Sequence, residues 1–190
     1  MFFIKRTNTL KLTITALLTA IAIMIPMVMP VRVVIPPMSF TLASHVAIFF
    51  AMFLSPKIAV LVSLGSAAGF LLAGLPIVIT LRALSHVVFA LIGAFYLQNR
   101  KEDVLSSPLK SQIFSFWIGL VHALAEVFVV SLFFLGILSG GDYDQGFFYV
   151  VFLLVGVGTL VHSMVDFFIT QIIWKSLGKR MNQIARKVTA

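Results

Sequence analysis

Hydrophobic residues in this chain form long runs that short polar stretches separate. An α-helix rises about 1.5 Å per residue, so about 20 apolar residues cross the hydrocarbon core of a bilayer, which is about 30 Å thick. Six runs approach that length, at about 12–29, 39–54, 58–73, 76–97, 113–138 and 147–174. The pattern predicts an all-α membrane protein, in which residues 1–190 form one domain, a single bundle of six transmembrane helices.

Composition supports a membrane setting, and no separate soluble domain is expected within these residues. Of the 190 residues, 61% are hydrophobic and only 11% are charged. The longest polar stretches are 98–112 and 175–190, and the second is expected to anchor at the anionic lipid surface. No G-x-x-x-x-G-K-[ST] phosphate loop occurs, so we expect any ATP hydrolysis to be supplied by another protein.

The basic residues predict the orientation, because lysine and arginine are retained on the cytoplasmic side of membranes. With both termini cytoplasmic, twelve of the 14 basic residues fall on that side: Lys5, Arg6, Lys11, Lys57, Arg100, Lys101, Lys110, Lys175, Lys179, Arg180, Arg186 and Lys187. The net charge of +8 then follows from topology. A nucleic-acid partner is not expected, since the basic residues flank apolar runs and form no separate patch.

Three pairs of ionisable residues lie inside the apolar runs. Arg82 precedes His86 by four positions, His122 precedes Glu126 by four, and His162 precedes Asp166 by four. Residues four apart share one face of a helix. Ionisable residues within a membrane are costly and usually face a protein interior, a water-filled cavity or a substrate. The pairs therefore predict a ligand site between three helices.

Depth in the membrane identifies which polar groups can meet. If the fourth helix runs inward from Pro76, Arg82 and His86 reach the same level as the second pair, and the start of the second helix reaches it from outside. We expect a pocket that opens outward. Its predicted ligand-binding residues are Arg82, His86, Glu126, His122, His45, Ser44, Thr41 and Phe40.

The chemistry of these residues favours a small organic acid. The guanidinium of Arg82 stays charged in a dry site and matches a planar carboxylate. Phe40, Phe89 and Phe128 are the expected apolar walls. In the alternative interpretation, Arg82 only forms a salt bridge with Glu126 that ties two helices together.

The histidines allow other interpretations. A histidine inside a membrane protein can simply bond a neighbouring helix, and the pair His162 and Asp166 is interpreted as structural in this way. His45, His86, His122 and Glu126 could also bind a divalent metal. No metal is expected, because the neighbouring guanidinium would repel a cation, and no cofactor is expected either.

Small residues and prolines shape the first part of the chain. Ala16 and Ala20 form a small-xxx-small motif, as does the stretch 65–69, and such motifs let helices approach closely. Pro26, Pro30, Pro36 and Pro37 are expected to end the first helix and to keep the next segment extended, as a structured outer loop over the pocket.

Taken together, these features resemble the substrate-binding S component of a bacterial energy-coupling factor vitamin transporter. The resemblance rests on chain length, six apolar runs, basic cytoplasmic ends, the segment from Lys11-Leu12-Thr13 to Ala16-x-x-x-Ala20, and the missing ATPase motif. It implies a multi-pass protein of the bacterial cell membrane that is not an enzyme. It also implies that Ala16 and Ala20 dock on a transmembrane coupling (T) subunit, which two cytoplasmic ATPase subunits power.

The resemblance also bears on the vitamin. The stretches 39–46 and 81–86 are most similar to pantothenate-type members, so pantothenate is the predicted substrate. Nicotinate is the alternative, since it would use the same Arg82 in a flatter aromatic slot. A self-contained proton-coupled or metal transporter stays open as a different class.

Overall fold

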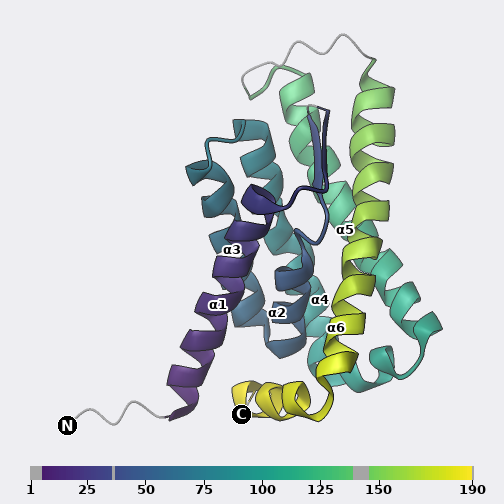
Figure 1. The fold of residues 1–190 in the computed structure, drawn as a ribbon. Coiled ribbons are helices and arrows are strands. Elements are labelled where there is room, and N and C mark those ends of the chain that lie inside the picture. Colours follow the sequence, from purple (N-terminus) through teal and green to yellow (C-terminus); the bar gives the residue numbers. More distant parts are fainter. Residues whose placement is uncertain (1–5, 36, 139–145, 190) are drawn as a thin grey trace.

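The computed structural model describes residues 6–35, 37–138 and 146–189. Its elements are α1 (Arg6–Val28), β1 (Arg32–Ile35), β2 (Met38–Thr41), α2 (Val46–Leu54), α3 (Pro56–Leu72), α4 (Ile77–Ser106), α5 (Pro108–Phe134), the π-helix η1 (Phe148–Val157) and α6 (Gly158–Thr189). Figure 1 shows the helices as one bundle, with the start of α1 and the end of α6 at the same end. The expected loop after residue 138 lies mostly outside the described residues.

Within the described residues, four helical stretches are long and apolar enough to cross a membrane: Thr9–Val28, Ile77–Ser106, Pro108–Phe134 and Phe148–Gly178. The predicted all-α membrane class is confirmed. The count of six spans is not, because α2 has 9 residues and reaches only about 14 Å. The 17 residues of α3 reach about 26 Å, slightly less than the hydrocarbon core.

Helix α2 is the centre of the bundle. All nine of its residues are buried, and it packs against α1, α3, α4 and α6. Ser55 both ends α2 and caps α3, because its side chain accepts a hydrogen bond from the Ile58 N–H and Pro56 follows at the first helical position. An apolar helix surrounded by others in this way is a core element, and it fixes the segment that precedes it.

The predicted helix at 39–54 is wrong in its first part. Residues Met38–Thr41 form a strand that pairs antiparallel with Arg32–Ile35, with Val33 opposite Phe40. The β-branched residues of β1 favour an extended backbone, and proline at position 37 cannot serve as a helix donor. The outer loop expected here is thus a β-hairpin, whose second strand carries the buried side chains Met38 and Thr41.

Other helix boundaries also differ from the expectation. Helix α1 continues past Pro26 to Val28, while Pro36 lies outside the described residues. The polar stretch 98–112 is helical except for a break at Ser107, whose side chain accepts the Lys110 N–H at the start of α5. Helix α6 bends at Gly178, which has a φ of 53°, and its last turns cross the end of the bundle (Figure 1).

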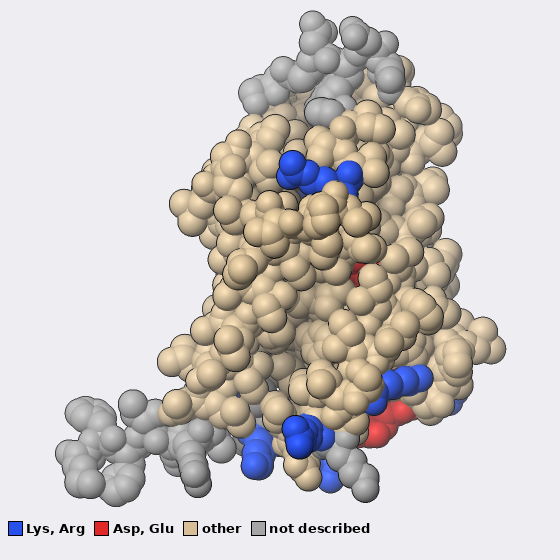
Figure 2. Space-filling view, viewed as in Figure 1, with Lys and Arg blue, Asp and Glu red and all other residues tan. Residues whose placement is uncertain are grey.

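Charged side chains gather at the ends of the bundle. Figure 2 shows lysine and arginine along the edge where α1 begins and α6 ends, with a smaller basic group near the opposite end. Between these two groups the surface is almost entirely free of charged side chains, apart from a small acidic spot. Large apolar side chains are exposed on the outside of the helices, among them Leu64, Phe95 and Leu124. Such a distribution is typical of a membrane protein whose middle section is surrounded by lipid.

Helix α1 contacts α3 through two glycines. A Cβ atom on Gly65 would lie 2.3 Å from the Thr19 Cγ2, and one on Gly69 would lie 2.6 Å from the Ile23 Cγ1. The stretch 65–69 is therefore a packing motif within the bundle. Ala16 and Ala20 lie on another face of α1 and are exposed in the chain alone.

We expect Gly65→Val to destabilise the bundle, because the added methyl groups collide with Thr19 and overpacking costs about 1–3 kcal/mol. The measurement is the midpoint of thermal unfolding in detergent. Gly146→Val is the matched control, since a Cβ on Gly146 has no neighbour within 4 Å. Equal midpoints for the two variants would contradict the close α1 and α3 packing.

Candidate functional site

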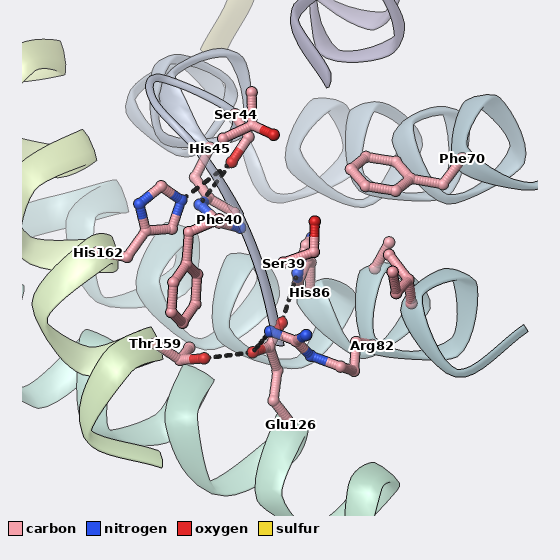
Figure 3. Close-up of a pocket in the computed structure, with 13 residues that line it drawn as sticks. Ser39, Phe40, Ser44, His45, Phe70, Arg82, His86, Glu126, Thr159 and His162 are labelled. Carbon is pink, nitrogen blue, oxygen red and sulfur yellow. Dashed lines mark hydrogen bonds and ion pairs between the residues drawn. The ribbon is translucent and has the colours of Figure 1, made fainter. Parts of the chain in front are cut away.

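A small polar cavity lies between β2 and the helices α3, α4, α5 and α6 (Figure 3). Its volume is about 20 Å³, which is room for about one water molecule. The side chains around it come from segments far apart in the sequence. They are Ser39, Phe40, Thr41, Ser44, His45, Phe70, Ile79, Arg82, Ala83, His86, Glu126, Thr159 and His162.

Arg82 and Glu126 form a buried ion pair on one wall. The Arg82 Nη2 donates to the Glu126 Oε2 at 2.7 Å, and both residues are 3% exposed. The Arg82 Nη1 donates to the carbonyl of Pro37, which links α4 to the hairpin. The Arg82 Nε has no hydrogen-bond partner among the described residues, so one directed donor of the guanidinium is still available.

Glu126 is the most heavily bonded carboxylate of the site. Besides Arg82, the Thr159 hydroxyl donates to its Oε2, and the His86 Nε2 lies 3.2 Å from its Oε1. The His122 Nε2 lies 3.4 Å from the same Oε1. These contacts join α4, α5 and α6 at one carboxylate, and they compensate for its removal from water.

Asp166 holds the turn between the hairpin and α2. Its Oδ1 accepts the Ala43 N–H at 2.8 Å, and its Oδ2 accepts the His45 N–H at 2.9 Å. The His45 Nδ1 lies 3.0 Å from the same Oδ2. Ala43 has a φ of 67°, an uncommon value for alanine, and the bonds to Asp166 stabilise this conformation.

All 4 histidines of the chain meet beside the cavity. The ring of His45 lies 4.7 Å from those of His86 and His122 and 5.0 Å from that of His162, measured between centroids. The rings of His86 and His122 are 4.8 Å apart. The turn before α2 and the helices α4, α5 and α6 thus each bring one imidazole to the same place.

The structure brings most of the predicted site residues together. Seven of the eight line the cavity: Arg82, His86, Glu126, His45, Ser44, Thr41 and Phe40. His122 instead lies behind the cavity wall, 0% exposed, with its ring 4.3 Å from that of Phe89. Phe128 does not form a wall as expected, since it is 65% exposed on the outer side of α5.

Sequence reasoning missed several lining residues. His162 was interpreted as structural, yet it lines the cavity and its Nε2 lies 3.1 Å from the Ser44 Oγ. Thr159 precedes His162 by three positions, so helical spacing could have placed it on the same face. Gly158 contributes by lacking a side chain, because a Cβ there would lie 2.7 Å from the Phe40 ring.

Comparison with known proteins identifies the family. Over 164 residues the chain is 43% identical to the niacin transporter NiaX of Lactococcus lactis subsp. cremoris (strain MG1363), covering 86% of this chain and 72% of that protein. This chain belongs to the NiaX family. It is accordingly a multi-pass membrane protein of a transporter family and not an enzyme. No family model and no solved structure matches the chain.

We expect Asp166→Ala to lower the thermal unfolding midpoint strongly. The variant leaves the buried His45 N–H, the half-buried Ala43 N–H and the His45 ring without their acceptor, and the loss at a buried group costs about 1–3 kcal/mol. Asp103→Ala is the control, because Asp103 pairs with Lys110 on the surface, where salt bridges contribute about 0–1 kcal/mol. Similar midpoints for both variants would contradict the anchoring role of Asp166.

Proposed function

We propose that this protein is the substrate-binding S component of an energy-coupling factor transporter, and that it binds nicotinate for uptake across the bacterial cell membrane. The observation that carries the proposal is a buried arginine with an unused donor, in a cavity of a chain 43% identical to a niacin transporter. A nicotinate carboxylate would pair with Arg82, since a guanidinium fork matches a planar carboxylate.

Nicotinate replaces pantothenate as the favoured substrate for two reasons. The matched relative is a niacin transporter, which favours the alternative over the first prediction. The cavity of about 20 Å³ also has to widen for any vitamin, and a flat, six-membered ring requires less displacement than a longer, branched chain. The rings of Phe40 and His162, 5.1 Å apart with 35° between their planes, supply an aromatic surface for it.

The hairpin is the element that would move when the vitamin enters. Strand β2 contributes three lining residues, and strand β1, which pairs with it, is exposed along its length. If the hairpin moves outward, Arg82 loses the Pro37 carbonyl and can pair with the vitamin carboxylate in its place. The substrate carboxylate would thus take over a bond that the empty site makes internally.

Uptake would depend on partner subunits. The chain has no phosphate loop, so a T subunit and two cytoplasmic ATPases would supply the energy, as the resemblance to S components implies. Ala16 and Ala20 are exposed on α1, and their small side chains would let a helix of the T subunit approach closely. In this proposal the basic end of the bundle, where α1 begins and α6 ends, faces the cytoplasm.

Calorimetric titration of the purified chain with nicotinate, nicotinamide and pantothenate tests the substrate. Arg82 cannot be removed alone without leaving Glu126 buried and unpaired, so we compare Glu126→Gln with the double variant Arg82→Met/Glu126→Gln. We expect Glu126→Gln to keep nicotinate binding, and the double variant to weaken it by roughly 30-fold or more.

Two outcomes would contradict the carboxylate clamp. One is equal nicotinate affinity in both variants, which would mean that the ion pair only joins α4 and α5. The other is equal affinity of the unmodified chain for nicotinate and nicotinamide, because nicotinamide lacks the carboxylate. Tight binding of pantothenate instead of nicotinate would restore the original substrate prediction.

We expect Ala16→Leu/Ala20→Leu to leave nicotinate binding intact but to prevent co-purification with the T subunit, since bulky side chains block a close helix approach. Ala68→Leu is the matched control, because Ala68 is an exposed alanine on α3. Normal assembly of the double variant would contradict the docking role. Nicotinate uptake by vesicles containing this chain alone would contradict the need for partners.

A further inference from the structure

Three of the four histidines have the geometry of a metal site. A ring nitrogen of each of His45, His86 and His122 lies within 4.8 Å of one from each of the others, and all three residues are buried. Nitrogens bound at about 2.0–2.1 Å to a tetrahedral ion lie about 3.4 Å apart, so the rings would approach one another slightly on binding. The three histidines come from the turn before α2, from α4 and from α5.

The hydrogen bonds of these histidines leave lone pairs for a metal. Ionised carboxylates accept only, so His86 donates its Nε2–H to Glu126 and His45 donates its Nδ1–H to Asp166. In a neutral imidazole the other nitrogen then carries a lone pair. The His86 Nδ1 and the His122 Nδ1 are buried without any hydrogen-bond partner among the described residues. Histidine ligands of metals typically donate their second N–H to a carboxylate in this way.

The charges of the cluster also favour a cation. With neutral histidines, Arg82 contributes +1, while Glu126 and Asp166 each contribute −1, so the buried cluster has a formal charge of −1. The repulsion expected from Arg82 is offset because Glu126 neutralises it at 2.7 Å. A nicotinate anion would bring the total to −2, and a divalent ion would bring it back to zero.

We propose that His45, His86 and His122 bind a divalent transition-metal ion beside the vitamin cavity, and that this ion balances the charge of the bound vitamin. Three imidazoles suit Zn²⁺ or Co²⁺ and leave one position of a tetrahedral ion open. The metal site rests on the arrangement of the histidines and on their hydrogen bonds and neighbouring charges, whereas its effect on the vitamin rests on the proposed function.

Titration of the metal-free, detergent-purified chain with Co²⁺ tests the site, because tetrahedral Co²⁺ shows strong visible absorption. We expect one Co²⁺ per chain, displaced by Zn²⁺. His122→Ala should abolish the absorption, and Asp166→Asn should weaken Co²⁺ binding about 10–100-fold. His162→Ala is the matched control and should keep it, since His162 is outside the three. Circular dichroism and size-exclusion chromatography establish that each variant is folded.

The same preparations separate this inference from the proposed function. We expect Zn²⁺ to raise nicotinate affinity about 10-fold or more in the unmodified chain and to have no effect in His122→Ala, whose side chain does not line the cavity. No saturable Co²⁺ binding to the folded chain, or binding that survives His122→Ala, would overturn the metal site. Equal nicotinate affinity with and without Zn²⁺ would overturn the charge-balancing role. Failure to bind nicotinate under either condition would instead contradict the proposed function.

Discussion

Charge burial is the constraint on which the interior of this protein depends. Glu126 and Asp166 lie in an apolar bundle, where an uncompensated carboxylate would cost several kcal/mol. Each is therefore satisfied by several groups from other parts of the chain: Glu126 by α4 and α6, and Asp166 by Ala43 and His45 in the turn before α2. The same bonds that compensate for burial determine how the helices and the hairpin are arranged around the cavity.

This arrangement explains how far the sequence could predict the site. The spacing of four in Arg82 and His86, and in His122 and Glu126, was enough to bring α4 and α5 together, because a helix converts spacing into a common face. The spacing alone does not predict which residues of that helix face line the cavity. His122, one helical turn before Glu126, packs on Phe89 behind the cavity wall. His162, which was interpreted as structural, lines the cavity next to Ser44.

The sequence predicted the elements that depend on a long apolar run. It did not predict the strands, which depend on pairing with each other. The long runs at 76–97 and 113–138 correspond to α4 and α5, whose ends lie some residues away from the prediction. The hairpin was missed because residues 39–54 are apolar enough for a helix. Strand β2 forms through its pairing with β1, and Asp166, more than 120 residues away, holds the turn that follows. Contacts over such a separation leave no local signal in the sequence.

The small size of the cavity has a further consequence for the proposed function. A cavity of only about 20 Å³ keeps its charged groups paired with one another. In the proposed function an entering anion would therefore have to replace existing partners, since there is no void for it to fill. Arg82 has two hydrogen-bond partners that an anion could replace. One is the charged carboxylate of Glu126 on α5, and the other is the neutral backbone carbonyl of Pro37 in the hairpin. Giving up the neutral carbonyl leaves no charge unpaired, whereas giving up Glu126 would. The least costly exchange is therefore the one that also frees the hairpin, and in the proposed function it would link recognition of a carboxylate to opening of the site.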